Sequence, residues 1–109
     1  MKMEKSLLLA VGLFAAATFA QAADEEAAKA LLKKNDCFKC HAVDKKKDGP
    51  PYKEVAKKQK GKPDAVDKLT KHITTKPMVE IDGKKEEHKA IKGEPGEIRN
   101  VVEWILSLS

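Results

Sequence analysis

Two cysteines and a histidine lie within five consecutive residues, Cys37-Phe38-Lys39-Cys40-His41. Two thiols three residues apart, followed at once by an imidazole, form the spacing at which a haem is covalently attached to a protein. Cys37 and Cys40 could add to the two vinyl groups of one porphyrin, and His41 would then lie under the ring as an axial ligand of the iron. The motif therefore predicts an iron redox centre.

Two other chemistries use part of the same motif. A dithiol oxidoreductase needs only the two cysteines, and a structural zinc site needs four ligands, so neither explains a histidine directly after the second cysteine. A Cys37–Cys40 disulfide is the main competitor to covalent haem, because an oxidising compartment would permit it. A thioredoxin-type oxidoreductase that used these cysteines would be colourless and would need a strand-rich fold, and strand signals are sparse in this chain.

The first 22 residues have the pattern of an export signal. Lys2 and Lys5 make the start positive, residues 6–19 are apolar or small, and Ala20-Gln21-Ala22 has the small-x-small pattern of a cleavage site. We expect cleavage before Ala23 and a periplasmic location. A retained anchor is the alternative, but the 14 residues of the apolar run are fewer than the roughly 20 that a bilayer span needs.

The remaining residues, 23–109, are expected to form a single domain. Loss of Lys2, Lys5 and Glu4 with the signal leaves 20 basic and 16 acidic residues of the original 22 and 17, a net charge of +4. With 36% charged residues in the whole chain, the apolar core must be thin for so short a domain. A buried haem would supply the missing apolar volume.

Apolar residues at helical spacing predict an all-α fold with four short helices. We expect these over residues 24–35, over 52–60, from near Pro63 to about 75, and from just after Gly96 to the C-terminus. The last helix is expected to pack across the first, with Trp104 at the edge of its apolar stripe. Between the third and fourth helices, Asp82-Gly83 flanked by alternating residues predicts a small hairpin.

Taken together, these features resemble the small bacterial class I cytochromes c, soluble electron carriers with one haem. The resemblance covers nearly all of residues 23–109 and rests, besides the haem motif, on Leu32, residues 49–56, Leu69, Ile73 and residues 104–106. It implies four helices around one covalently bound haem c. It also implies that the carbonyl of Pro50 accepts a hydrogen bond from the axial His41, and that Tyr52 packs near the haem or its propionates.

The sixth iron ligand departs from the family pattern, in which a methionine flanked by prolines precedes the last helix. Met78 follows a proline, but it lies 26 residues before Trp104 and only five after Ile73. His88 lies 16 before Trp104 and 15 after Ile73, close to the family spacing. We therefore expect His88 as the distal ligand, with Met78 as the alternative. His72 is expected to be a half-exposed helix residue outside the site.

Two protein ligands on the iron would exclude substrates, so the resemblance predicts a one-electron carrier and not an enzyme. Imidazole in place of methionine would lower its reduction potential. A haem-based module that senses NO or CO through a labile sixth ligand is the alternative function.

Lysine clusters at residues 45–47, 57–58, 60–62 and 84–85 could surround an exposed haem edge and attract acidic docking surfaces of periplasmic or membrane redox proteins. We expect a monomer that binds no nucleic acid and has no membrane span after signal cleavage.

Overall fold

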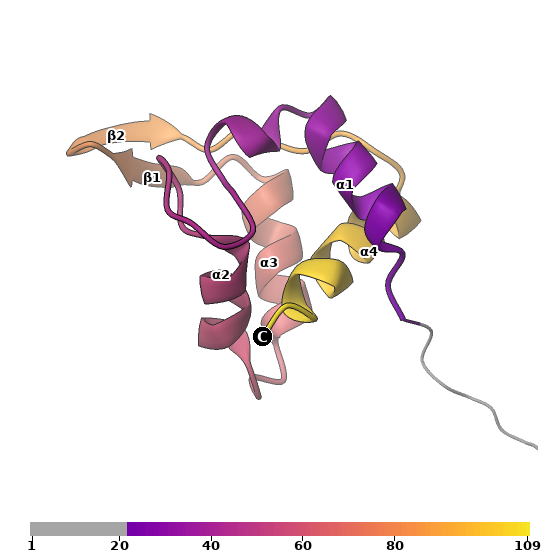
Figure 1. Cartoon of the computed structure of the whole chain (residues 1–109). Helices are drawn as coiled ribbons and strands as arrows, with labels where there is room; N and C mark the ends of the chain where they lie inside the picture. Colours follow the sequence, from indigo (N-terminus) through magenta and orange to yellow (C-terminus); the bar gives the residue numbers. More distant parts are fainter. Residues whose placement is uncertain (1–21) are drawn as a thin grey trace, which may run out of the picture.

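The computed structural model describes residues 22–109, so the expected signal peptide, apart from Ala22, lies outside the described residues. In chain order the elements are helix α1 (Glu25–Lys34), the 3₁₀ turn η1 (Cys37–Lys39), helices α2 (Tyr52–Gln59) and α3 (Ala65–Thr74), strands β1 (Met78–Ile81) and β2 (Lys84–Glu87), and helix α4 (Pro95–Leu106) (Figure 1). Across the described residues this is the expected arrangement of four short helices with a hairpin before the last.

Local side-chain chemistry explains where the first and last helices begin. Asp24 precedes α1, and its carboxylate accepts a hydrogen bond from the amide of Ala27 at 3.0 Å. Helix α4 begins at Pro95, earlier than the sequence predicted, because proline suits the first helical position. Glu94 and Glu97 form a reciprocal capping box at the same end.

Two further helix boundaries differ from prediction: α4 ends at Leu106, short of the C-terminus, and α3 starts later than expected. Helix α3 begins at Ala65, and Pro63 lies in the turn before it. In that turn the amide of Ala65 donates a hydrogen bond to the carbonyl of Lys62 at 3.2 Å. The hairpin turn is where it was expected. Asp82 and Gly83 have φ angles of 51° and 80°, the left-handed pair that a two-residue turn between twisted strands requires.

The core lies where α4 crosses α1, with α2 and α3 packed against α4 (Figure 1). Val101 and Val102 of α4 are fully buried. Trp104, expected at the edge of the stripe, is instead 3% exposed, because its ring packs edge-on against Tyr52 with centroids 6.2 Å apart. The other buried apolar side chains are those of Ala28, Leu31, Leu32, Tyr52, Ala56, Ala65, Ile91 and Ile105.

Helix α3 differs from the others in what its apolar face contacts. Leu69 and Ile73 are only partly buried, and both line a cavity. Its apolar stripe therefore faces a hollow in the molecule. None of the helices in residues 22–109 has both the length and the apolar character that crossing a membrane requires.

Candidate functional site

The two cysteines and His41 are placed by a tight turn directly after α1. The carbonyl of Cys37 accepts hydrogen bonds from the amides of Cys40 at 3.3 Å and His41 at 3.1 Å, so the three residues share one turn. Asp36 introduces the turn in a left-handed conformation, with φ of 60°. Both thiols are free, and both line the cavity.

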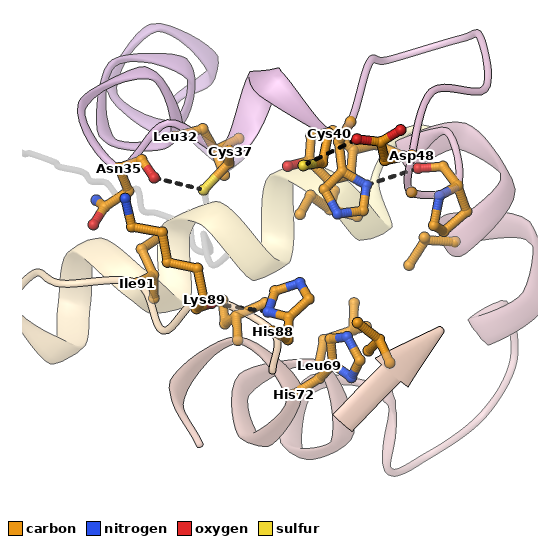
Figure 2. Close-up of a pocket in the computed structure, with 18 of the residues that line it drawn as sticks. Leu32, Asn35, Cys37, Cys40, Asp48, Leu69, His72, His88, Lys89 and Ile91 are labelled. Carbon is orange, nitrogen blue, oxygen red and sulfur yellow. Dashed lines mark hydrogen bonds between the residues drawn. The ribbon is translucent and has the colours of Figure 1, made fainter. Parts of the chain in front are cut away.

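This cavity, of about 770 Å³, lies between η1, the three helices that follow it and the hairpin (Figure 2). His41 and His88 both line it, as do Pro50 and Tyr52. Its walls are largely aliphatic, from Leu32, Val55, Leu69, Ile73, Ile91, Val101, Val102 and Ile105.

The ring of His41 is oriented by three neighbours. Its Nδ1 lies 2.8 Å from the carbonyl oxygen of Pro50, to which it donates as the protonated ring nitrogen. The ring stacks on Tyr52, with centroids 4.9 Å apart and planes at 18°, and the backbone of Gly49 passes against it. Burial lowers the pKa of His41, outweighing the Pro50 hydrogen bond, which raises it. His41 is therefore held neutral, with Nε2 unprotonated.

His88 follows β2 and has the same ring chemistry. Its Nδ1 lies 2.8 Å from the carbonyl oxygen of Lys89, again the geometry of a donated hydrogen bond, so Nε2 is the ring nitrogen not used in that bond. Its amide donates to the carbonyl of Pro77 at 2.8 Å, one step beyond the hairpin ladder. The ring centroids of His41 and His88 are 6.2 Å apart. With metal–nitrogen bonds of about 2 Å, two imidazoles on one metal ion lie about 6 Å apart.

Met78 lies elsewhere. Its side chain is 61% exposed, while its strand neighbours Val79 and Ile81 line the cavity. Successive side chains of a strand point to opposite faces of the sheet. Because the side chain of Val79 points toward the cavity, that of Met78 points away from it. The structure thus brings His88 into the cavity with His41 and leaves Met78 out of it.

Sequence reasoning missed the residues that join the two sides of the cavity. Asn35, at the end of α1, is 6% exposed; its amide nitrogen donates to the carbonyl of Lys92 at 3.1 Å, and its oxygen accepts from the Lys92 amide at 2.9 Å. Next to it, Asp36 pairs with Lys89 at 3.4 Å. The segment after His88 is therefore held against the cysteine turn. An asparagine at a helix C-terminus was the only sequence signal.

His72 also lies in the cavity wall, although it was expected outside the site. It is one turn from Leu69 on α3, and its ring centroid is 4.6 Å from that of His88. Burial and the neighbouring imidazoles lower the pKa of His72. The signal that could have found it is the three-residue spacing from Leu69, which places both on one helical face.

The thiols do not have the setting of a dithiol catalyst. Catalytic cysteines of that kind have a lowered pKa, often at a helix N-terminus. Here burial raises the pKa of Cys37, outweighing the charge of Lys89, which lowers it. The turn also follows the C-terminal end of a helix.

Comparison with known proteins decides between these readings of the motif. The family model described as "Cytochrome c" matches residues 25–109, nearly all of the described chain. The chain belongs to the cytochrome c family. Cytochrome c-552 of Hydrogenobacter thermophilus is 44% identical over 71 residues, and cytochrome c-551 of Stutzerimonas stutzeri is 39% identical over 69. The matches span 65% and 63% of this chain and 65% and 66% of those relatives, about two thirds of their length.

Solved structures of cytochromes c show the same fold. The class 1 cytochrome MtoD from Sideroxydans lithotrophicus ES-1 is 54% identical, with a TM-score of 0.78 over 80% of this chain and 98% of its own. Wild-type cytochrome c552 of Nitrosomonas europaea is 28% identical, with a TM-score of 0.61 over 74% of this chain and 99% of its own. The expected class I cytochrome c fold is confirmed.

Membership of the cytochrome c family implies one covalently attached haem c with its iron and a role in electron transport, and residues 37–41 fit the attachment motif. The cavity suits that group, because its walls are aliphatic and thiols lie at one side. Gln59, in the wall, has a buried side-chain oxygen without a hydrogen-bond partner. A half-turn of its amide would present the NH₂ group there. With Lys58 and Lys68, also in the wall, it would offer hydrogen-bond donors to the carboxylates of a bound haem.

Proposed function

We propose that the protein is an exported, periplasmic one-electron carrier. Cys37 and Cys40 form the thioether bonds, His41 is the proximal iron ligand and His88 the distal one. When bound, the haem supplies an iron that cycles between the ferrous and ferric states. Cleavage of the predicted signal after Ala22 would release the domain of residues 23–109 on the side of the membrane where haem is attached.

The observation that carries this proposal is the pairing of His41 with His88. Their centroid separation of 6.2 Å suits two imidazoles on one metal. Each ring also has its Nδ1 engaged by a backbone carbonyl, at 2.8 Å in both cases. Metal-binding histidines commonly use their second nitrogen in this way, which fixes the tautomer and leaves Nε2 as the ligand.

Two ligands from the protein suit electron transfer better than chemistry on a substrate. With Nε2 of both His41 and His88 engaged, a substrate has no free position on the iron. The aliphatic walls keep water from the site and so limit reorganisation around a changing charge. Imidazole in place of methionine removes the bias toward a high reduction potential, so we expect a lower-potential carrier.

We propose periplasmic or membrane redox proteins with acidic docking surfaces as partners. The net charge of +4 on residues 23–109 supports this, since opposite charge speeds brief encounters. Of the lysine clusters in the sequence, only Lys58 lines the cavity, joined there by Lys39, Lys68 and Lys89. The hairpin side of the rim carries glutamates, Glu80, Glu86 and Glu87. Docking should therefore favour the lysine side, near α2 and α3.

Visible and near-infrared spectra of the oxidised and reduced holoprotein test the ligand set, in the wild type and in His88→Ala and Met78→Ala variants. We expect a low-spin wild type without a methionine-to-iron charge-transfer band. The sixth ligand should be lost in His88→Ala and kept in Met78→Ala. If the band is present and disappears in Met78→Ala, the distal assignment is wrong.

Addition of CO to the same reduced samples tests the function. We expect no binding by the wild type and binding by His88→Ala. Rapid binding by the wild type would favour the ligand-sensing alternative over electron transfer.

A further inference from the structure

The hydrogen bonds of His88 itself reach only the other side of the hairpin and the adjacent residue. Its amide donates a hydrogen bond to the carbonyl of Pro77, just across the hairpin, and its ring Nδ1 is hydrogen-bonded to the carbonyl of the adjacent Lys89. All four residues of β2, directly before it, are exposed. These bonds set the tautomer and position of His88, but they do not join its ring to the helices.

His72 provides contact between that ring and the helical body. The two ring centroids are 4.6 Å apart with the planes at 60°, and Figure 2 shows the side chains next to each other in the cavity. Contact between two tilted aromatic rings depends on the orientation of both planes. The amide of Ile91 also donates to the carbonyl of Ile73 at 2.7 Å, which holds the segment after His88 against α3 beside His72.

We propose that His72 is a positioning residue that fixes the plane of the His88 imidazole relative to that of His41. The inference rests on the proposed function, in which both His41 and His88 bind iron. An imidazole bound to a metal through one nitrogen can rotate about the metal–nitrogen bond. The orientation of its ring plane is therefore set by contacts with other side chains. In this structure the planes of His41 and His88 make an angle of 48°.

The angle between two axial imidazoles has a measurable electronic effect. Each imidazole donates electron density to the iron d orbitals through its π system, so the relative orientation of the planes sets the splitting of those orbitals. The g values of the ferric protein in electron paramagnetic resonance respond to that splitting, and the reduction potential shifts with it. A residue that contributed only to folding would leave the g values unchanged.

The test compares haem-loaded wild type with His72→Leu, His72→Ala and His72→Phe. Leucine fills the volume without a planar ring, whereas phenylalanine keeps the ring. Lys71→Ala, at an exposed neighbouring position on α3, is the matched control. We expect all four variants to stay low-spin. His72→Leu and His72→Ala should show shifted g values, a broader signal and a shifted potential, while His72→Phe and Lys71→Ala should match the wild type.

Wild-type g values in both His72→Leu and His72→Ala would overturn the inference while leaving His88 as ligand. Equal shifts of the g values in His72→Phe and His72→Leu would also overturn it, because an aromatic ring at position 72 would then have no effect of its own on the orientation of His88. A methionine charge-transfer band in the wild type would instead overturn the proposed ligand set itself. If His72→Leu does not fold, His72→Ala decides.

Discussion

Gly49 lies where no larger residue fits beside the proposed proximal ligand. A Cβ atom at this position would be 2.5 Å from Cε1 and 2.8 Å from Nδ1 of His41, closer than real contacts of such an atom. The Gly49 amide also donates to the carbonyl of Cys40 at 2.6 Å, so the backbone cannot move away freely. The absence of a side chain here lets the Pro50 carbonyl reach the ring.

We therefore expect Gly49→Ala to displace the His41 ring and weaken its hydrogen bond to Pro50. Overpacking of this kind costs about 1–3 kcal/mol, and the altered ligand field should shift the reduction potential. Denaturant unfolding and a redox titration of the holoprotein measure both. Gly96→Ala is the control, since nothing lies within 4 Å of the added atom. Wild-type stability and potential in Gly49→Ala would contradict this view of the site.

At the scale of single residues, the sequence predicted most where the signal is local. Spacing alone placed the cysteines and His41 in one turn, and the Pro50 contact, implied by family resemblance, is present in the structure. The contacts of His72 with His88 and of Asn35 with Lys92 were not predicted, because each pair is distant in sequence. Such pairings depend on how the chain folds back on itself.

Among the elements, the hairpin determines where His88 lies. Its ladder pairs Met78 with Glu87, and the bond from the His88 amide to Pro77 continues that register. The hairpin extends outward from the helices (Figure 1). Because β2 is exposed throughout and gains little from packing, the stability of the hairpin depends on the turn, in which Gly83 has φ of 80°.

We expect Gly83→Ala to destabilise the protein by about 1–2 kcal/mol, since a Cβ is disfavoured in the left-handed region. The loosened ladder should also make His88 easier to displace. Gly61→Ala is the matched control, because Gly61 has φ of 79° and open surroundings like Gly83 but lies between α2 and α3. Denaturant unfolding should show similar losses in both, and only Gly83→Ala should bind CO faster. Equal CO kinetics in both variants would mean that the hairpin does not hold His88.

The helices and the hairpin were predictable because the spacing of apolar residues and the residue types of the turn are local features of the sequence. The Asp82-Gly83 turn and the end of α1 were found within one residue. Two details were wrong for reasons of tertiary packing or capping. Trp104 is buried because Tyr52 packs against it from another helix, and α4 begins at Pro95 because the capping box forms there.

At the scale of the whole molecule, the fold is built around a cavity that protein atoms do not fill. The apolar core is confined mainly to the crossing of α1 and α4, while Leu69 and Ile73 of α3 face the cavity. Without the haem, the apolar side chains that line this open cavity would lie against water, whereas a bound haem would cover them and add apolar burial to a small core. The helical arrangement around the cavity should therefore depend on the bound haem.

We expect the Cys37→Ala/Cys40→Ala protein, which cannot form either thioether, to lose helical content and unfold over a broad range once haem is removed. Cys37→Ala alone, with one attachment point kept, should fall between it and the wild type. Far-ultraviolet circular dichroism during heating measures both quantities. A haem-free double variant with wild-type helicity and a sharp transition would contradict this expectation, and would mean that the crossing of α1 and α4 suffices to hold α2 and α3. Asn35 and Asp36, at the end of α1, contact Lys92 and Lys89, in the segment that leads into α4, and these contacts need no cofactor. We therefore expect the crossing of α1 and α4 to keep its structure longest.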